Sequence, residues 1–351
     1  MKALVLAGGS GSRLRPLSEF MPKQLAPVAN KPVLEYVLEN IRSLGVTDIG
    51  MVVGDWEPEI RRAIGDGSRF GATITYLRQD RPYGLAHCVT LARRFLGDDD
   101  FAMFLGDNLL PDGVDRIASQ FRRERPAAHV VVHRVDDPRA FGVAELDAGG
   151  RVRKLVEKPQ QPRSDLALIG VYFFTSAIHR AVASIEPSRR GELEITDAIQ
   201  WMLNHGSDIG CSEYHGYWKD TGRAEDLLEA NRHILGNLRG GMEGSADAAS
   251  VLRGRVSVGP GARVVRSHIE GPAVIGPGAI VEDSRIGPCT AIGADSRLHQ
   301  VDLADAIVLD HITLRGPHRA RGALFCPSAV MTADPPSSAA APRPAAKGVR
   351  G

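Results

Sequence analysis

A glycine-rich stretch near the start of the chain is followed at once by fixed positive charge. The glycines are Gly8, Gly9 and Gly11, and the basic residues after them are Arg13, Arg15 and Lys23. Without Cβ atoms, a backbone can approach a ligand closely and turn its N–H groups toward it. Arginine and lysine bind phosphate oxygens through charge-assisted hydrogen bonds. The stretch therefore predicts a triphosphate site.

Two better-known phosphate-binding patterns do not fit this stretch. The dinucleotide pattern GxGxxG would need a glycine where the chain has Leu14, and no GK[ST] follows as in a Walker A loop. A glycine loop after a strand often only turns the chain. The residue types alone therefore leave a plain turn and a triphosphate site both open.

A carboxylate stands at the end of an apolar run later in the chain. The run is Phe101 to Leu105, and Gly106, Asp107 and Asn108 follow it. Aspartate is depleted in strands, so its position at a strand tip suggests a ligand. It could equally form an Asx turn. From this stretch alone, both interpretations stay open.

The complete string GGSGSRLRPLS, followed by PKQL, resembles the signature of the sugar-1-phosphate nucleotidyltransferases, GGxGTRLxPxT followed by PK. Ser12 and Ser18 stand where that family has threonines, and both keep the hydroxyl group. Further motifs of the family follow in the expected order, including GDN, EKP, GELEITD and WKDTG. The resemblance covers about residues 1–235.

The resemblance implies a nucleotide site in which Gln79 pairs with the edge of a pyrimidine base. A glutamine offers a donor and an acceptor, which suits thymine or uracil. The implied nucleotide-binding residues are Leu6, Ala7, Gly8, Gly9, Gly11, Ser12, Arg13, Lys23, Gln79, Pro82, Gly84 and Asp107.

The resemblance also implies a sugar-phosphate site and a Mg²⁺ ion held by Asp107 and Asp220, which lie far apart in the sequence. The implied sugar-phosphate-binding residues are Asn108, Gly142, Glu157, Lys158, Tyr172 and Glu194. The implied catalytic residues are Arg13, Lys23, Asp107, Lys158 and Asp220. The expected reaction transfers a nucleotidyl group, dTMP from dTTP in the first place, to a hexose 1-phosphate, in the first place glucose 1-phosphate.

Alternating strand and helix patterns predict the element that positions the glycine loop. Residues 3–7 read as a buried strand, residues 31–44 as an amphipathic helix and residues 49–53 as a second strand. Such alternation predicts an α/β fold whose sheet is mostly parallel, with ligands beyond the carboxyl ends of the strands. With the resemblance, we expect a Rossmann-like three-layer domain with a mostly parallel mixed sheet.

The second half of the chain carries a repeat. Apolar residues recur at intervals of five and six, so that Val258, Ile275, Ile292 and Leu309 stand 17 residues apart. This hexapeptide pattern resembles a left-handed parallel β-helix. We expect a catalytic domain at 1–236, a linker at 237–250, a β-helix at 251–332 and a disordered tail at 333–351. So short a β-helix would need its ends covered, which predicts a homo-oligomer.

Composition excludes some classes of partner. The chain has 351 residues and a formal net charge of +1, with no charge block suited to nucleic acid or a membrane. Four cysteines without a CxxC pair favour a reduced, cytoplasmic protein. We therefore expect nucleotide and sugar phosphate as partners, without nucleic acid or membrane.

Three alternatives remain open. The chain could use UTP or another nucleotide, or it could be a catalytically silent regulator of the same fold. It could also be a β-helix acyltransferase, for which His268, His299 and His311 would be the candidate bases. Consumption of acyl-CoA would distinguish the last from the others.

Overall fold

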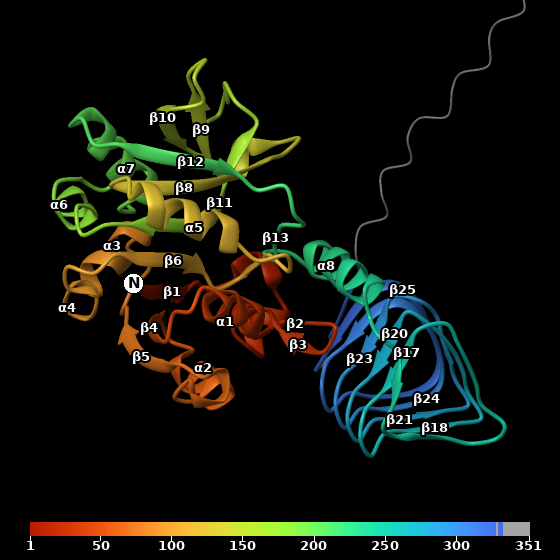
Figure 1. Ribbon diagram of the computed structural model, residues 1–351. Helices are drawn as coiled ribbons and strands as arrows, with labels where there is room; N and C mark the ends of the chain where they lie inside the picture. Colours follow the sequence, from red (N-terminus) through yellow and green to blue (C-terminus); the bar gives the residue numbers. More distant parts are fainter. Residues whose placement is uncertain (328, 333–351) are drawn as a thin grey trace, which may run out of the picture.

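The computed structural model describes residues 1–327 and 329–332 and shows two parts, a helix-flanked sheet and a stack of strand coils (Figure 1). The first part contains nearly all of the residues that the sequence marks as a site. Residues 333–351, expected to be a disordered tail, lie outside the described residues.

The main sheet is mixed. Within the described residues it has nine strands, with the path β10-β9-β11-β6-β1-β4-β5, while β8 pairs with β11 and β12. Strands β6, β1, β4 and β5 are parallel, β11 runs antiparallel to β6, β8 and β9, and β10 runs antiparallel to β9. The strands are β1 (Lys2–Ala7), β4 (Asp48–Val53), β5 (Thr73–Arg78), β6 (Phe101–Leu105), β8 (Ala128–Arg134), β9 (Gly142–Leu146), β10 (Val152–Glu157), β11 (Leu166–Phe174) and β12 (Ile209–Glu213).

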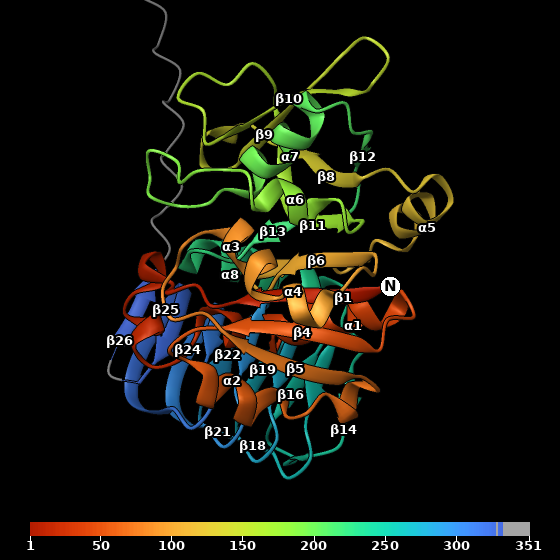
Figure 2. The ribbon, with the colours of Figure 1, turned by 90° about the vertical axis from the view of Figure 1, so that its left-hand side faces the viewer.

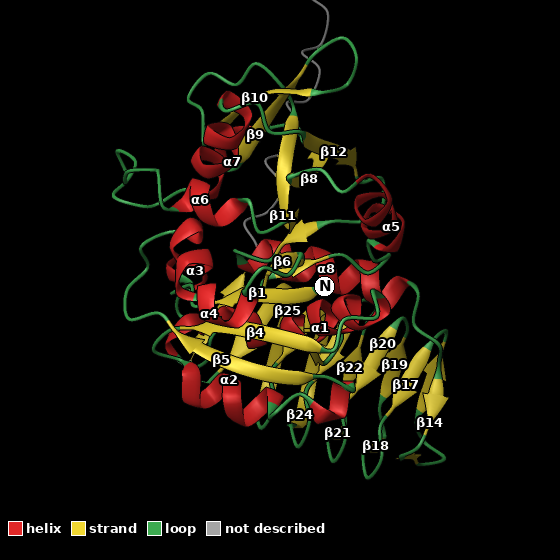
Figure 3. Ribbon diagram, turned by 60° about the vertical axis from the view of Figure 1, so that its left-hand side comes forward, coloured by secondary structure: helices red, strands yellow, loops and turns green. Residues whose placement is uncertain are grey.

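Helices cover both faces of this sheet, which makes three layers (Figure 3). Successive side chains of a strand point to opposite faces. Accordingly, Leu4 and Leu6 pack with α3, α6 and α7, whereas Ala3 and Val5 pack with α1, α2 and α5. The helices are α1 (Val33–Ser43), α2 (Glu57–Ile64), α3 (Leu85–Leu91), α4 (Arg93–Leu96), α5 (Asp115–Glu124), α6 (Ile178–Val182), α7 (Ile195–Asn204) and α8 (Ala224–Gly236). Among the helices described, none combines the length and apolarity that crossing a membrane requires.

Parallel strands bring the site residues to one edge of the sheet. β1 ends at Ala7, just before the glycine loop (residues 8–23), and its parallel neighbour β6 ends at Leu105, just before Asp107. A two-residue strand, β7 (Asn108–Leu109), then pairs antiparallel with β13 (Lys219–Asp220). This pairing places the second predicted metal ligand beside the first.

The second part, here called the coil domain (residues 240–332), consists of short strands stacked in parallel. Its register steps by 17 residues, so that Val264 lies beside Val281 and Ile275 beside Ile292. The apolar residue of each step is buried inside the stack. The strands are β14 (Gly241–Met242), β15 (Ser245–Ala246), β16 (Val251–Arg253), β17 (Val256–Val258), β18 (Arg263–Val265), β19 (His268–Glu270), β20 (Ala273–Ile275), β21 (Ile280–Glu282), β22 (Arg285–Ile286), β23 (Thr290–Ile292), β24 (Arg297–Val308), β25 (Thr313–Cys326) and β26 (Ala329–Thr332).

The stretch 237–250, expected to be a linker, already belongs to the stack. β14 pairs with β17, and β15 pairs with β18, each in the same 17-residue register. The pattern was missed because small residues stand where later coils have large apolar ones. The stack therefore begins before residue 251. The two-residue hairpin strands β2 (Pro27–Val28) and β3 (Lys31–Pro32), in contrast, belong to the first part.

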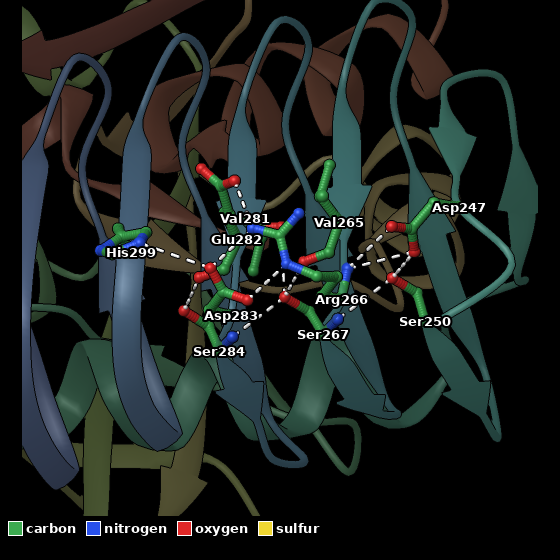
Figure 4. A network of polar contacts seen from close by, with 10 residues as sticks. All are labelled: Asp247, Ser250, Val265, Arg266, Ser267, Val281, Glu282, Asp283, Ser284 and His299. Carbon is green, nitrogen blue, oxygen red and sulfur yellow. Dashed lines mark hydrogen bonds and ion pairs between the residues drawn. The ribbon is translucent and has the colours of Figure 1, made fainter.

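A ladder of serines runs along one corner of the coil domain (Figure 4). The Ser250 hydroxyl accepts the Ser267 N–H at 3.1 Å, and the Ser267 hydroxyl accepts the Ser284 N–H at 3.0 Å. Ser267 also donates to the Val265 carbonyl at 2.8 Å. Each hydroxyl thus satisfies a backbone group where the chain turns and the regular ladder is interrupted.

One continuous hydrophobic core joins the two parts. It contains Leu14 and Leu17 from the glycine loop, Leu227 and Leu228 from α8, and the inward residues of the coils. Fully buried Asn231 of α8 accepts the Ala29 N–H at 2.9 Å and donates to the Cys289 carbonyl at 2.9 Å. The coil domain therefore packs directly beneath the glycine loop.

Candidate active site

A single cleft at the carboxyl edge of β1 and β6 gathers most of the residues that the sequence analysis names. Its lining includes the following expected residues: Leu6, Gly8, Gly9, Arg13, Lys23, Gln79, Pro82, Gly84, Asp107, Asn108, Gly142, Glu157, Lys158, Tyr172, Glu194 and Asp220. They come from segments up to about 200 positions apart, so only the fold brings them together.

Three expected nucleotide-binding residues do not line the cleft. Ala7 is buried inside the sheet, with 2% of its surface exposed. Gly11 and Ser12 lie at the start of a short 3₁₀ helix, where Gly11 adopts a left-handed backbone at φ 66°. These residues shape the loop from behind, and their role in binding stays a prediction.

The glycine loop wraps closely around Lys23. A Cβ atom on Gly9 would lie 2.8 Å from Lys23 Cε, so the loop needs glycine there. Lys23 Nζ in turn donates to the Asp107 carboxylate. Burial alone would lower the pKa of Lys23, but Asp107 and Asp220 outweigh burial and raise it. The ammonium group is therefore fixed and charged at the centre of the phosphate end.

Asp107 and Asp220 share this end of the cleft. Burial opposes the ionisation of Asp107, yet Lys23 keeps the pKa of Asp107 below its ordinary value. Burial and the neighbouring Asp107 raise the pKa of Asp220 to about 6. Thr221 holds the Asp107 backbone through a hydroxyl that donates to its carbonyl at 2.8 Å. Two adjacent carboxylates, with one ammonium among them, would gain from a further cation.

These carboxylates fit a divalent metal. Magnesium at phosphate sites is commonly held by one or two carboxylates and the substrate oxygens. Among the described residues there is no group of three or more potential protein ligands, so a dedicated all-protein cage is not built here. The pair matches the open arrangement that a metal shared with a triphosphate requires.

The base end of the cleft centres on Gln79. Its side chain is buried, and its Nε2 lies 2.9 Å from His87 Nδ1. The loop between them is held against the sugar side, because the Ala86 N–H donates to the Leu193 carbonyl at 3.0 Å. Gly84, at φ 102°, would place a Cβ 2.3 Å from that carbonyl, so only glycine fits.

The sugar end carries two carboxylates beside two cations. Glu157 Oε2 accepts the Thr196 hydroxyl at 3.1 Å, and Lys158 Nζ lies 3.6 Å from Glu157 Oε1. Arg190 reaches Glu194 at 3.1 Å and Glu157 at 3.5 Å. Burial and Glu157 raise the pKa of Glu194. Carboxylates are good acceptors for sugar hydroxyls, and the cations suit a sugar phosphate.

Sequence reasoning missed several lining residues. Arg190 lies in an irregular loop before GELEITD, and one arginine among many carries no pattern. Gln24 is 1% exposed, and its Oε1 lacks a hydrogen-bond partner within the described chain. The string PKQL, already noted, could have drawn attention to Gln24. The remaining additions are Leu85, Cys88, Leu105, Ala140, Phe141, Leu168, Glu192 and Ile195.

Comparison with known proteins settles the family. The family model described as nucleotidyl transferase matches residues 2–237. The chain belongs to the nucleotidyl transferase family. The family expected from the glycine loop is thereby confirmed, and the matched residues contain the whole cleft.

Relatives within this nucleotidyl transferase family are similar over nearly their whole length. A glucose-1-phosphate thymidylyltransferase from Streptomyces antibioticus is 54% identical over 326 residues, which are 93% of this chain and 92% of the relative. One from Streptomyces griseus is 50% identical, covering 95% and 94%. A solved Bacillus anthracis structure described as a glucose-1-phosphate thymidylyltransferase superposes with a TM-score of 0.62 at 34% identity, covering 66% and 94%.

The three histidines considered for acyl transfer lie in the coil domain, outside this cleft. His299 Nε2 is 3.4 Å from Asp283, and His311 Nδ1 is 3.9 Å from Asp295. His268 is half-buried on β19. No geometry at these positions favours acyl transfer over nucleotidyl transfer.

Proposed function

We propose that the chain is a glucose-1-phosphate thymidylyltransferase, which transfers dTMP from dTTP to glucose 1-phosphate and releases pyrophosphate. The observation that carries the proposal is the order of groups along one cleft. A pyrimidine-suited glutamine, a phosphate end with Lys23, Asp107 and Asp220, and a sugar end with Glu157 and Lys158 follow one another. The two Streptomyces relatives of that name support the choice of substrates.

In the proposed mechanism an oxygen of the sugar phosphate attacks the α-phosphorus of dTTP. Attacking and leaving groups are both phosphates, so little proton transfer is required, and catalysis is positioning plus charge neutralisation. Arg13 and Lys23 hold the triphosphate, while Lys158 orients the attacking phosphate. Arg190 and Thr196 fix the carboxylates that bind the sugar hydroxyls. Each group therefore acts by holding charge at a set place.

We infer that Mg²⁺ is the cofactor and that Asp107 and Asp220 hold it. When bound, the ion would neutralise the charge on the phosphate oxygens. The raised pKa of Asp220 supports this assignment, because a nearby cation would favour its ionised form.

We further propose that the coil domain is a left-handed parallel β-helix beginning near residue 240, after a catalytic domain that ends near residue 236. The 17-residue register and the stacked strands in Figure 1 support this. A homo-oligomer involving this domain stays a prediction, as does the cytoplasmic location expected from the cysteines. Light scattering would test the first.

The proposed function predicts a clear nucleotide preference. With glucose 1-phosphate, dTTP should give the highest kcat/KM, UTP measurable turnover and ATP or GTP little, because Gln79 suits a pyrimidine imide. Thymine differs from uracil by one methyl group, worth only about 1–3 kcal/mol, so UTP use should persist. Gln79→Ala should reduce the pyrimidine preference on the order of tenfold.

Release of pyrophosphate from each nucleotide and sugar-phosphate pair would measure this preference. Gln161→Ala, at an exposed position outside the cleft lining, serves as the control and should leave the preference intact. A preference for ATP or GTP in the unaltered protein would overturn the base-reading role of Gln79.

Lys158 should act on one substrate only. We expect Lys158→Ala to raise the KM for glucose 1-phosphate at least about tenfold, with a smaller effect on the KM for dTTP, because its proposed partner is the sugar phosphate. Lys154→Ala on the same strand, with an exposed side chain, is the matched control. Equal changes in both KM values would contradict the assignment.

A further inference from the structure

A second hollow adjoins the cleft at Arg13, which lines both. Its walls come from three places: Arg13 and Arg15 on the glycine loop, Arg223 just before α8, and Val330 and Met331 on β26. Its volume of about 490 Å³ lies within the range of small-ligand sites, roughly 300–1,000 Å³. The coil domain therefore supplies one wall of a hollow that opens from the phosphate end of the cleft.

Positive charge converges on this hollow with little local compensation. Arg13 reaches Asp220 only at 3.9 Å, and Arg15 reaches Glu19 only at 3.9 Å, with side chains 56% and 72% exposed. Within the described residues, Arg223 forms no ion pair within 4.0 Å, and Glu225 is the acidic residue of the lining. Three guanidinium groups placed together repel one another, and a polyanion bound between them would relieve that repulsion.

The hollow lies on the side toward which the leaving group moves. The sugar-binding strands β9 and β10 and the terminal strand β26 lie on opposite sides of β1 (Figure 2). In the transfer, the bond from the sugar-phosphate oxygen to the α-phosphorus forms while the bond from the α-phosphorus to the bridging oxygen breaks. The electron pair of the broken bond stays on that oxygen, and pyrophosphate departs opposite the sugar.

We propose that Arg15 and Arg223, together with Arg13, form a product site that receives pyrophosphate after this bond breaks. The inference rests on the proposed function, since it assigns the exit of that reaction's product. It separates Arg15 and Arg223, which bind the product after cleavage, from Lys23, which binds the intact triphosphate. Another phosphorylated small molecule would satisfy the same charges, so the test includes one.

The test measures inhibition of the forward reaction by added pyrophosphate in Arg15→Gln, Arg223→Gln and the double variant. We expect the inhibition constant to rise about 3-fold to 10-fold for each exposed charge removed, while the KM for dTTP changes less than about twofold. Arg15→Lys and Arg223→Lys keep the charge and should recover part of the affinity. Arg62→Gln, on the exposed side of α2, is the control and should change nothing.

An unchanged inhibition constant in the double variant would overturn the proposal. Equal increases in the KM for dTTP would also overturn it, because the arginines would then belong to the triphosphate site. If glucose 6-phosphate altered the rate of the unaltered protein and the double variant abolished that effect alone, the occupant would be a phosphate ester from solution. Absence of any forward thymidylyl transfer would refute the proposed function instead, which keeps the two failures distinguishable.

Discussion

Replacing either carboxylate at the phosphate end should cut turnover on the order of 10²–10³-fold at ordinary Mg²⁺ concentrations. Asp107→Asn and Asp220→Asn keep the shape of the side chain and remove its charge. Asp107 is 6% exposed and already paired with Lys23, so its loss would also leave a buried ammonium group uncompensated. The effect should therefore appear in kcat and not only in KM.

The measurement is kcat as a function of Mg²⁺ concentration for both variants. Asp226→Asn is the matched control, because Asp226 lies in the first turn of α8 close enough to influence Asp220 but outside the cleft lining. We expect it to change kcat only a few-fold. Turnover near that of the unaltered protein in both site variants would show that the metal assignment is wrong.

Removing residues 237–351 should destabilise the remaining part strongly. The deletion exposes Leu227 and Leu228 of α8 and removes the packing beneath Leu14 and Leu17. Exposing one buried leucine costs about 1.5–3 kcal/mol, so several together approach the total stability of a domain, about 5–15 kcal/mol. Thermal unfolding should shift down by many degrees, and the KM for dTTP should rise because the glycine loop loses its support.

A point variant tests the same joint without removing the domain. Asn231→Ala leaves the Ala29 N–H and the Cys289 carbonyl without their side-chain partner, which should lower the free energy of unfolding by about 2–4 kcal/mol. Asn237→Ala, at the exposed end of α8, is the control. A truncated protein that stays soluble, melts normally and binds dTTP normally would contradict the support that we assign to the coil domain. One that is soluble, correctly assembled and wholly inactive would show that this domain carries part of the site.

Local patterns made much of this architecture predictable. The strand at β1 and the glycine loop follow from a short apolar run and closely spaced glycines, and the 17-residue repeat follows from apolar spacing. The helix expected to run on to Leu96 instead breaks at Ala92 into α3 and α4. Such features depend on neighbours in sequence, which is why pattern reasoning reaches them.

Long-range pairings were not predictable in the same way. β7 and β13 have two residues each, too few for any periodicity, yet their pairing sets Asp220 beside Asp107. Arg190 and Asn231 look like ordinary polar residues until the fold supplies their partners. Nor could the sequence indicate that Leu14, inside a polar loop, belongs to the same core as the coils. Each of these depends on contacts between segments far apart in the chain.

The serine ladder limits how the length of this protein can change. A hydroxyl in one coil meets a backbone N–H 17 residues later, and the inward apolar positions keep the same spacing. Adding or removing a single residue there would shift every later side chain out of its row, whereas a block of 17 would restore all rows at once. Natural or designed variants should therefore differ in this half of the chain by whole coils, so that its length is a count of modules.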